Sequence, residues 1–193
     1  MKLFLNLKKG SGNLVQVKGS KFSYTQMMVA IPVSFIGMLF VLREGIRFES
    51  NYSLYYLASS MVFIPILVYG MLWYFPAFIP GKVLVTIIPG ENGQIKGGRK
   101  SVRIKDIKEM FFYRRSINLM NMIMIETIDG KKVRIPTYSL LSDAAFSIMV
   151  DQFIFPYMNE QAKIVWDRQI DLDILYKRTS YKRPETEDTT IHH

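Results

Sequence analysis

The stretch from Phe22 to Leu42 reads FSYTQMMVAIPVSFIGMLFVL and contains no charged residue. A helix rises about 1.5 Å per residue, so this stretch would span roughly 30 Å, the thickness of the hydrocarbon core of a bilayer. A second uncharged stretch, from Ser50 to Gly81, is longer still and has aromatic residues near both ends, where they favour the membrane interface. The two stretches predict two transmembrane helices, with spans at about residues 24–42 and 54–75.

Two alternatives, the core helices of a soluble protein and a signal peptide, fit these two stretches less well than transmembrane helices do. Core helices of a soluble protein usually carry a polar stripe, and neither stretch has a charge on any face. A cleaved signal peptide would need a short lead and a small-residue cleavage site, whereas residues 1–21 precede the first stretch and a second stretch follows it. Ala30, Ser34 and Gly37 could let the two helices approach closely, or are simply residues common in membrane helices.

The distribution of charge predicts the orientation of this pair of helices. Only Arg43 to Glu49 and the polar start of the second stretch separate the two spans, so the helices should form an antiparallel hairpin (residues 22–81). Residues 1–21 form a basic lead with five lysines and no acid, and residues 82–134 hold 12 basic and 5 acidic residues. By the positive-inside rule, we expect a multi-pass protein of the cell membrane with two spans and with both termini in the cytoplasm.

The composition excludes several kinds of chemistry. The chain has 193 residues, 25 Lys+Arg, 16 Asp+Glu, a net charge of +9 and no cysteine. Disulfides, iron–sulfur clusters, cysteine-ligated zinc and thiol catalysis are therefore excluded. The two histidines, His192 and His193, end the chain, where catalytic geometry is hardest to hold, and they could equally be the remnant of a purification tag.

Local structure accounts better for the remaining candidate catalytic or metal-binding residues. Ser139 and Ser142 have no histidine to activate them, and helix capping is the better assignment. Asp167, Asp171 and Asp173 offer oxygen ligands for a hard cation, but their spacing matches no EF-hand loop and fits a solvated acidic face. We expect a protein that is not an enzyme, with no catalytic residue, no cofactor and no metal site.

Beyond Gly81 the sequence changes to short β-prone stretches separated by turn signals. Asp129-Gly130 lies between two such stretches and is the strongest hairpin signal in the chain. Ser142 can cap a helix that starts at Asp143 and carries an apolar stripe. We expect a domain over residues 82–158, a helical extension over 159–178 and a disordered tail over 179–193; whether Leu14 to Val17 adds a strand is left open. The residues of the apolar stripe are Phe146, Met149, Val150, Phe153 and Tyr157.

Two motifs in this region resemble those of the bacterial pleckstrin-homology-like (PH-like) domains. One is VRIKDIKE, from Val102 to Glu109, and the other is the hairpin IDGKKVRIP, from Ile128 to Pro136, with a single helix after it. Such domains occur beside two membrane helices in a family of small, uncharacterised Gram-positive membrane proteins. The resemblance implies an α+β membrane protein, with the transmembrane hairpin followed by a PH-like antiparallel β-barrel or sandwich capped by a C-terminal helix. It implies no catalytic residue.

The basic residues of the domain are the candidate contact site for an anionic lipid or a protein partner. Each lysine or arginine close to an anionic leaflet contributes about 1 kcal/mol to membrane attraction. The alternative is that the excess of positive charge only fixes topology and solubility. Nucleic-acid binding is not expected, because the aromatic residues are concentrated in the spans and no recognition motif accompanies the charge. The candidate residues are Lys96, Arg99, Lys100, Arg103, Lys105, Lys108, Arg114 and Arg115.

Two functions of different classes follow from this sequence. The first is a non-enzymatic membrane protein that lies in the lipid bilayer and whose PH-like domain binds a protein partner or an anionic lipid at the inner face. The alternative is an immunity factor against a membrane-acting toxin, in which the helical hairpin is the working part. Self-association of the helices into a homo-oligomer is left open.

Overall fold

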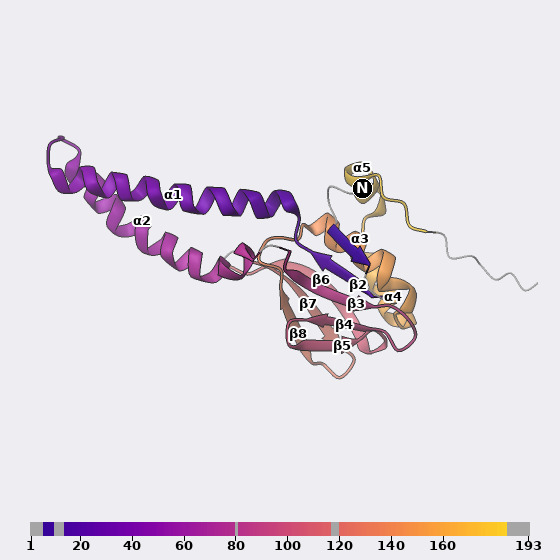
Figure 1. Cartoon of the computed structure of the whole chain (residues 1–193). Helices are drawn as coiled ribbons and strands as arrows, with labels where there is room; N and C mark the ends of the chain where they lie inside the picture. Colours follow the sequence, from indigo (N-terminus) through magenta and orange to yellow (C-terminus); the bar gives the residue numbers. More distant parts are fainter. Residues whose placement is uncertain (1–5, 10–13, 80, 117–119, 185–193) are drawn as a thin grey trace, which may run out of the picture.

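The computed structural model describes residues 6–9, 14–79, 81–116 and 120–184. Two long helices, α1 (Lys21–Arg47) and α2 (Ser53–Tyr74), project side by side from a body of strands and shorter helices (Figure 1). All strand pairs in that body are antiparallel. The architecture is therefore α+β, with two apolar helices joined to antiparallel sheets and followed by further helices.

The predicted pair of helices is present, with longer limits than the sequence suggested. Helix α1 has 27 residues, or about 40 Å, so Arg43 and Glu44 lie in its last turns and not in the connection. Helix α2 continues into the 3-10 turn η1 (Phe75–Phe78). Both helices are long and apolar enough to cross a membrane by length and composition, and almost none of their apolar residues is buried inside the protein.

The two helices contact each other along a seam of partly covered side chains. On α1 these side chains recur every three or four residues, which keeps them on one face of the helix. At the far end of the seam Gly45 is buried, and a Cβ atom at this position would lie 2.8 Å from the backbone nitrogen of Leu57. On α2 Ser53 and Ser60 are buried, and Ser60 Oγ donates to the Tyr56 carbonyl oxygen at 2.7 Å. The seam residues of α1 include Met27, Ile31, Phe35, Met38 and Leu42.

The small residues expected at this contact are not the ones that make it. Ala30, Ser34 and Gly37 are exposed, and a Cβ atom at Gly37 would meet nothing within 4 Å. They lie on a different face of α1 from the seam. Composition alone does not say which face of an apolar helix meets its neighbour.

The strands form two sheets. The five-stranded sheet has the order β1 (Asn6–Lys9), β2 (Val15–Lys18), β3 (Val83–Ile88), β4 (Gln94–Gly97), β5 (Lys100–Arg103). The three-stranded sheet has the order β6 (Ile107–Arg114), β7 (Asn121–Thr127), β8 (Lys132–Pro136), and a short 3-10 turn, η2 (Ile104–Asp106), precedes it. Within the described residues the strands therefore pair as two separate sheets and do not close into the barrel that the resemblance implied.

Part of the basic lead belongs to the five-stranded sheet. Strand β2 pairs with β3, with Val17 opposite Val85, and Val17 is fully buried. The residues Leu14 to Val17, left open by the sequence, thus contribute a strand. The sheet starts before the helices and resumes after them, so the domain is not confined to residues 82–158.

The helix that follows the strands agrees with its prediction up to Phe153. Helix α3 (Asp143–Phe153) begins after Ser142, whose side chain accepts a hydrogen bond from the Ala145 N–H at 3.2 Å. Phe146, Met149, Val150 and Phe153 of its apolar stripe face the core, where the rings of Phe146 and Phe112 stack with centroids 5.3 Å apart. The fifth residue of the predicted stripe, Tyr157, lies beyond the end of α3 and is 37% exposed, so this part of the prediction is wrong. The Asp129-Gly130 hairpin between β7 and β8 is also confirmed, with Gly130 at φ +77°.

The C-terminal part differs from its prediction. The expected extension consists of two helices, α4 (Glu160–Gln169) and α5 (Leu172–Thr179), after the 3-10 turn η3 (Phe155–Tyr157). The expected disorder from residue 179 is wrong up to Pro184, because Tyr181 is buried and Arg183 makes ion pairs. The rest of the predicted tail, residues 185–193, lies outside the described residues.

Candidate functional site

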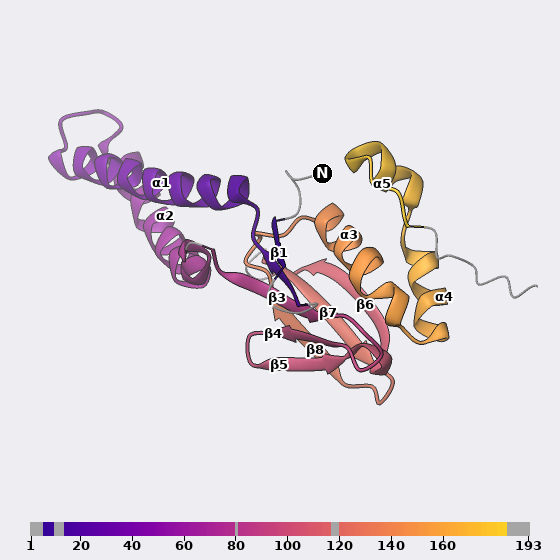
Figure 2. The ribbon, with the colours of Figure 1, turned by 45° about the vertical axis from the view of Figure 1, so that its right-hand side comes forward.

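The register of the strands places the eight predicted contact residues at opposite ends of the sheets. Strand β3 leaves the helices at Val83, and Ile88 at its other end lies opposite Gln94. The β4–β5 turn therefore lies at the end nearest the helices, and Arg103, opposite Gln94, lies at the far end (Figure 2). Only part of the predicted cluster is brought together. Lys96, Arg99, Lys100, Arg114 and Arg115 lie toward the helices, and Arg103, Lys105 and Lys108 lie away from them.

The lysines at the far end are paired with carboxylates. Lys108 Nζ lies 2.9 Å from Glu126 Oε1, and Lys132 Nζ lies 3.3 Å from Glu126 Oε2. The hydrogen bonds from Lys108 and Lys132 lower the pKa of Glu126, and the same contact raises the pKa of Lys108. Lys105 Nζ lies 3.9 Å from Glu91. These local carboxylates offset part of the positive charge at the far end.

The helices are attached to the sheets at a region that we call the hairpin base, residues 18–24, 78–79, 81–83 and 136–140. The Ser20 N–H donates to the Leu140 carbonyl oxygen at 2.9 Å, and Tyr24 OH donates to the Phe78 carbonyl oxygen at 3.0 Å. A Cβ atom at Gly19 would lie 2.6 Å from Leu140 Cβ, so only glycine allows this close approach. The base therefore fixes both helices to the domain at once.

The hairpin base holds two lysines that the predicted site did not include. Lys82 Nζ lies 4.5 Å above the centre of the Tyr138 ring, and burial lowers the pKa of this lysine. Lys18 lies opposite Val83 in the β2–β3 pair, which places it beside Lys82. The sequence did contain one indication of Lys18 and Lys82, because no acidic residue lies near either lysine in the chain.

A strained turn supports the Tyr138 ring. Tyr138 and Ser139 have φ values of +51° and +55°, in the left-handed region that residues other than glycine rarely adopt. The Leu140 N–H closes the turn by donating to the Thr137 carbonyl oxygen at 2.9 Å. Such strain persists where the surroundings fix the conformation, and here the turn carries both the ring beneath Lys82 and the carbonyl group that binds Ser20.

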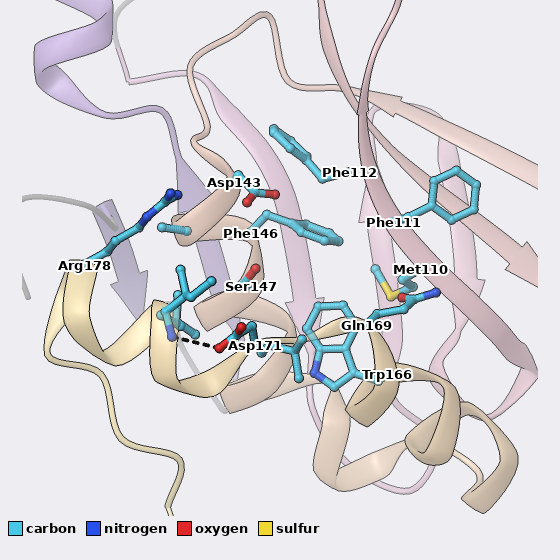
Figure 3. A pocket seen from close by; sticks show the side chains of 14 residues that line it. Met110, Phe111, Phe112, Asp143, Phe146, Ser147, Trp166, Gln169, Asp171 and Arg178 are labelled. Carbon is cyan, nitrogen blue, oxygen red and sulfur yellow. Dashed lines mark hydrogen bonds between the residues drawn. The ribbon is translucent and has the colours of Figure 1, made fainter.

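A second feature is a groove between β6 and the three C-terminal helices. Its volume is about 250 Å³ and it opens to solvent. Phe112, Phe146 and Trp166 line it together with Asp143 and Arg178, which are contributed by α3 and α5 (Figure 3). Asn159 covers the start of β6 by donating to the carbonyl oxygens of Lys105 and Ile107. A ligand in this groove would therefore meet aromatic rings, with one acidic and one basic side chain beside them.

Comparison with known proteins identifies the family. Residues 13–176 match a group described as "Family of unknown function (DUF5381)". The chain belongs to this family. Because the match runs from before β2 into α5, the strands β2 to β8, the two apolar helices and the C-terminal helices belong to one DUF5381 unit. The PH-like character implied by the sequence is not shown by this match.

Two relatives of this DUF5381 protein come from Bacillus subtilis (strain 168). "Uncharacterized lipoprotein YfjD" is 30% identical over 158 residues, which cover 79% of this chain and 85% of the relative. "Uncharacterized protein YfjE" is 34% identical over 134 residues, which cover 65% of this chain and 86% of the relative. No solved structure matches the chain.

Two of the three acidic residues considered for a cation in this DUF5381 chain, Asp167 and Asp171, have other partners. Asp171 caps α5 by accepting a hydrogen bond from the Ile174 N–H at 2.8 Å. Asp167 Oδ1 accepts a hydrogen bond from Arg183 Nη1 at 2.7 Å. Across residues 6–9, 14–79, 81–116 and 120–184, no group of three or more acidic or histidine side chains could hold a metal ion.

A buried carboxylate fastens the end of the described chain to α3 and α4. Asp151 on α3 is 1% exposed and accepts hydrogen bonds from Trp166 Nε1 at 3.2 Å and from Tyr181 OH at 2.9 Å. Arg183 Nε donates to both carboxylate oxygens at 2.9 and 3.0 Å. We call these four side chains the Asp151 network. The network holds the chain beyond α5 in place.

The Asp151 network should make stability fall at alkaline pH. Burial, and then the charge of Asp151, raise the pKa of Tyr181 above that of an unfolded tyrosine. The stabilisation is therefore complete below about pH 10, the pKa of an unfolded tyrosine, and decreases as the pH rises toward the higher folded value. Thermal unfolding in detergent should show a smaller alkaline decrease for Tyr181→Phe than for the wild type. Tyr157→Phe, at a more exposed position, is the control, and an equal effect of both changes would contradict the assignment.

Proposed function

We propose that this chain is a two-span membrane protein whose helical hairpin holds a binding domain at the cytoplasmic face. The observation that carries the proposal is the apolar surface of α1 and α2, which no other part of the described chain covers. Apolar surfaces of this extent are rare on soluble monomers and mark contact with a membrane or a partner. The name of the relative "Uncharacterized lipoprotein YfjD" also supports association with a membrane. The exposed side chains include Val29, Val33, Ile36, Phe40, Met61, Val62, Ile66 and Leu72.

The length and the charges of the helices support spanning over lying on the surface. The uncharged part of α1, Phe22 to Leu42, matches the thickness of the hydrocarbon core, and charged residues begin immediately at both of its ends. The exposed apolar side chains occur on all sides of the hairpin except the seam between the helices. A helix that lies in the interface would instead have one charged face.

We further propose that the sheets and α3 form a PH-like domain that acts by binding and not by catalysis. In support, two antiparallel sheets enclose one core and a helix with an apolar stripe closes it, which is the arrangement that the resemblance implied apart from barrel closure. The absence of cysteine from the chain removes thiol chemistry. The two candidate surfaces, the groove beside β6 and the hairpin base, offer aromatic contacts and positive charge.

Cysteine labelling tests the spans and the orientation directly, because the chain has no cysteine. Ser50→Cys places a thiol in the connection between the helices, and Ser101→Cys places one on the exposed side of β5. In intact cells a membrane-impermeant maleimide should label Ser50→Cys and should leave Ser101→Cys unlabelled until the cells are permeabilised. The unchanged chain is the control for background labelling.

The same experiment has outcomes that contradict the proposal. Labelling of Ser101→Cys in intact cells would place the domain outside. Protection of both positions in intact cells would mean that the connection does not reach the outer face. Release of the chain from membranes by alkaline carbonate would show that the helices are not embedded in the bilayer.

A further inference from the structure

We propose that the hairpin base binds the phosphate group of an anionic phospholipid through Lys18, Lys21 and Lys82. The inference rests on the proposed membrane spans, because they bring the hairpin base to the level of the lipid headgroups. It replaces the predicted cluster with a site made by three segments that are distant in the sequence.

The geometry gathers the three lysines around the start of α1. Lys18 ends β2 opposite the start of β3, and Lys82 is the residue immediately before that strand. A Cβ atom built on Gly81 would lie 3.7 Å from Lys18 Nζ, so the Lys18 side chain extends over the segment that leads to Lys82. Lys21 is the first residue of α1. The hydrogen bonds of Ser20 and Tyr24 hold these segments together.

The hairpin base has positive charge and no local carboxylate. The segments that meet there contain no acidic residue, since residues 1–43, 50–90 and 130–142 lack Asp and Glu. None of the ion pairs of the described chain involves Lys18, Lys21 or Lys82. Lys82 is also partly removed from water and lies against an aromatic ring. A desolvated ammonium group is stabilised by an anion, and the segments that meet at the hairpin base contain no carboxylate side chain to supply one.

The position of the hairpin base relative to the proposed spans favours a lipid headgroup as the anion that the three lysines bind. The uncharged part of α1 starts at Phe22, directly after Lys21. Tyr24 on α1 and Trp73 and Tyr74 on α2 are aromatic residues near this end of the helices, and such residues favour the headgroup region. Lysines just outside a span meet the phosphate groups at that level. The far-end lysines, which are paired with Glu91 and Glu126, lie at the opposite end of the sheets.

Native mass spectrometry of the full chain can measure this binding. The protein is extracted from nanodiscs made of equal parts phosphatidylcholine and phosphatidylglycerol, and the lipid that remains bound is identified. Wild-type protein should retain phosphatidylglycerol in preference to phosphatidylcholine. Lys18→Gln/Lys82→Gln should reduce that preference roughly 25-fold, since each lysine contributes about a factor of five. Lys18→Arg/Lys82→Arg keeps the charge and should retain the lipid.

The matched control removes two charges from the far end. Arg103→Gln/Lys105→Gln should leave the retained lipid unchanged, although it lowers the net charge by the same amount. Equal retention of the two lipids by the wild type, or equal loss in both double variants, would overturn the site. Displacement of the lipid by inorganic phosphate at equal concentration would assign the site to a free phosphate and overturn the lipid assignment. Failure of the cysteine-labelling test would instead remove the spans, so the two proposals fail separately.

Discussion

Asp151→Asn should lower the free energy of unfolding by about 3 kcal/mol, the cost of leaving one member of a buried ion pair without its partner. In the native protein the Asp151 carboxylate accepts hydrogen bonds from Trp166, Tyr181 and Arg183. The Arg183 side chain is only 24% exposed, so water replaces little of the lost interaction. The segment after α5 should then detach from α3. Urea unfolding in detergent, followed by tryptophan fluorescence, measures the loss.

Asp167→Asn is the matched control for this change. Asp167 bonds to the same guanidinium group, with Arg183 Nη1 2.7 Å from its carboxylate, but its side chain is 48% exposed. Exposed ion pairs contribute about 0–1 kcal/mol, so this variant should remain close to the wild type. Equal losses in the two variants would show that the Asp151 network does not depend on the buried carboxylate. Limited proteolysis after α5 provides a second measurement, and only Asp151→Asn should expose the site.

Gly97→Val should destabilise the domain by about 1–3 kcal/mol, the usual cost of overpacking a core. Gly97 ends β4, where the five-stranded sheet faces β8, and a Cβ atom there would overlap the side chain of Ile135. Ile135 is fully buried, so it has no free space to move into. The same urea unfolding experiment measures the effect.

A double-mutant cycle distinguishes this overlap from a general effect of valine in the strand. Ile135→Ala alone should cost about 2–5 kcal/mol because it leaves a cavity, but combined with Gly97→Val it should cost less than the sum of the single changes. Ser101→Val, at an exposed position of β5, should have little effect. Additive costs in the double variant would show that Gly97 and Ile135 do not meet.

Local patterns in the sequence were sufficient to predict the two apolar helices, the Asp129-Gly130 hairpin and the cap of α3 at Ser142. Each depends on residues that are close in the chain, such as an uninterrupted apolar stretch or a capping side chain before an apolar stripe. The strand at Val15–Lys18 could not be assigned in the same way, because it is completed by β3 on the other side of both helices. The Asp151 network also depends on distant residues, so the order that it gives the segment up to Pro184 has no local signal.

The candidate site, too, could not be predicted from local patterns, because it depends on residues that are distant in the chain. The predicted residues were close in sequence, from Lys96 to Arg115, and the strand register separates them to the two ends of the sheets. Lys18 and Lys82 are far apart in the sequence and adjacent in the fold. Five of the eight predicted residues lie toward the helices and three lie away from them, so proximity in sequence was a poor guide to which side chains share a surface.

The pairing of Lys18 with Val83 means that the two apolar helices are a removable insertion in an otherwise continuous β-meander. The chain leaves the sheet at the end of one strand and re-enters it at the start of the neighbouring strand, so the gap to be bridged is no longer than an ordinary tight turn. Replacing residues 19–82 by Asn-Gly, a dipeptide suited to such turns, should therefore yield a soluble form of the domain that keeps the core residues of the sheets and of α3 and loses the buried Ala77. We therefore expect that the domain and the two apolar helices can be exchanged independently.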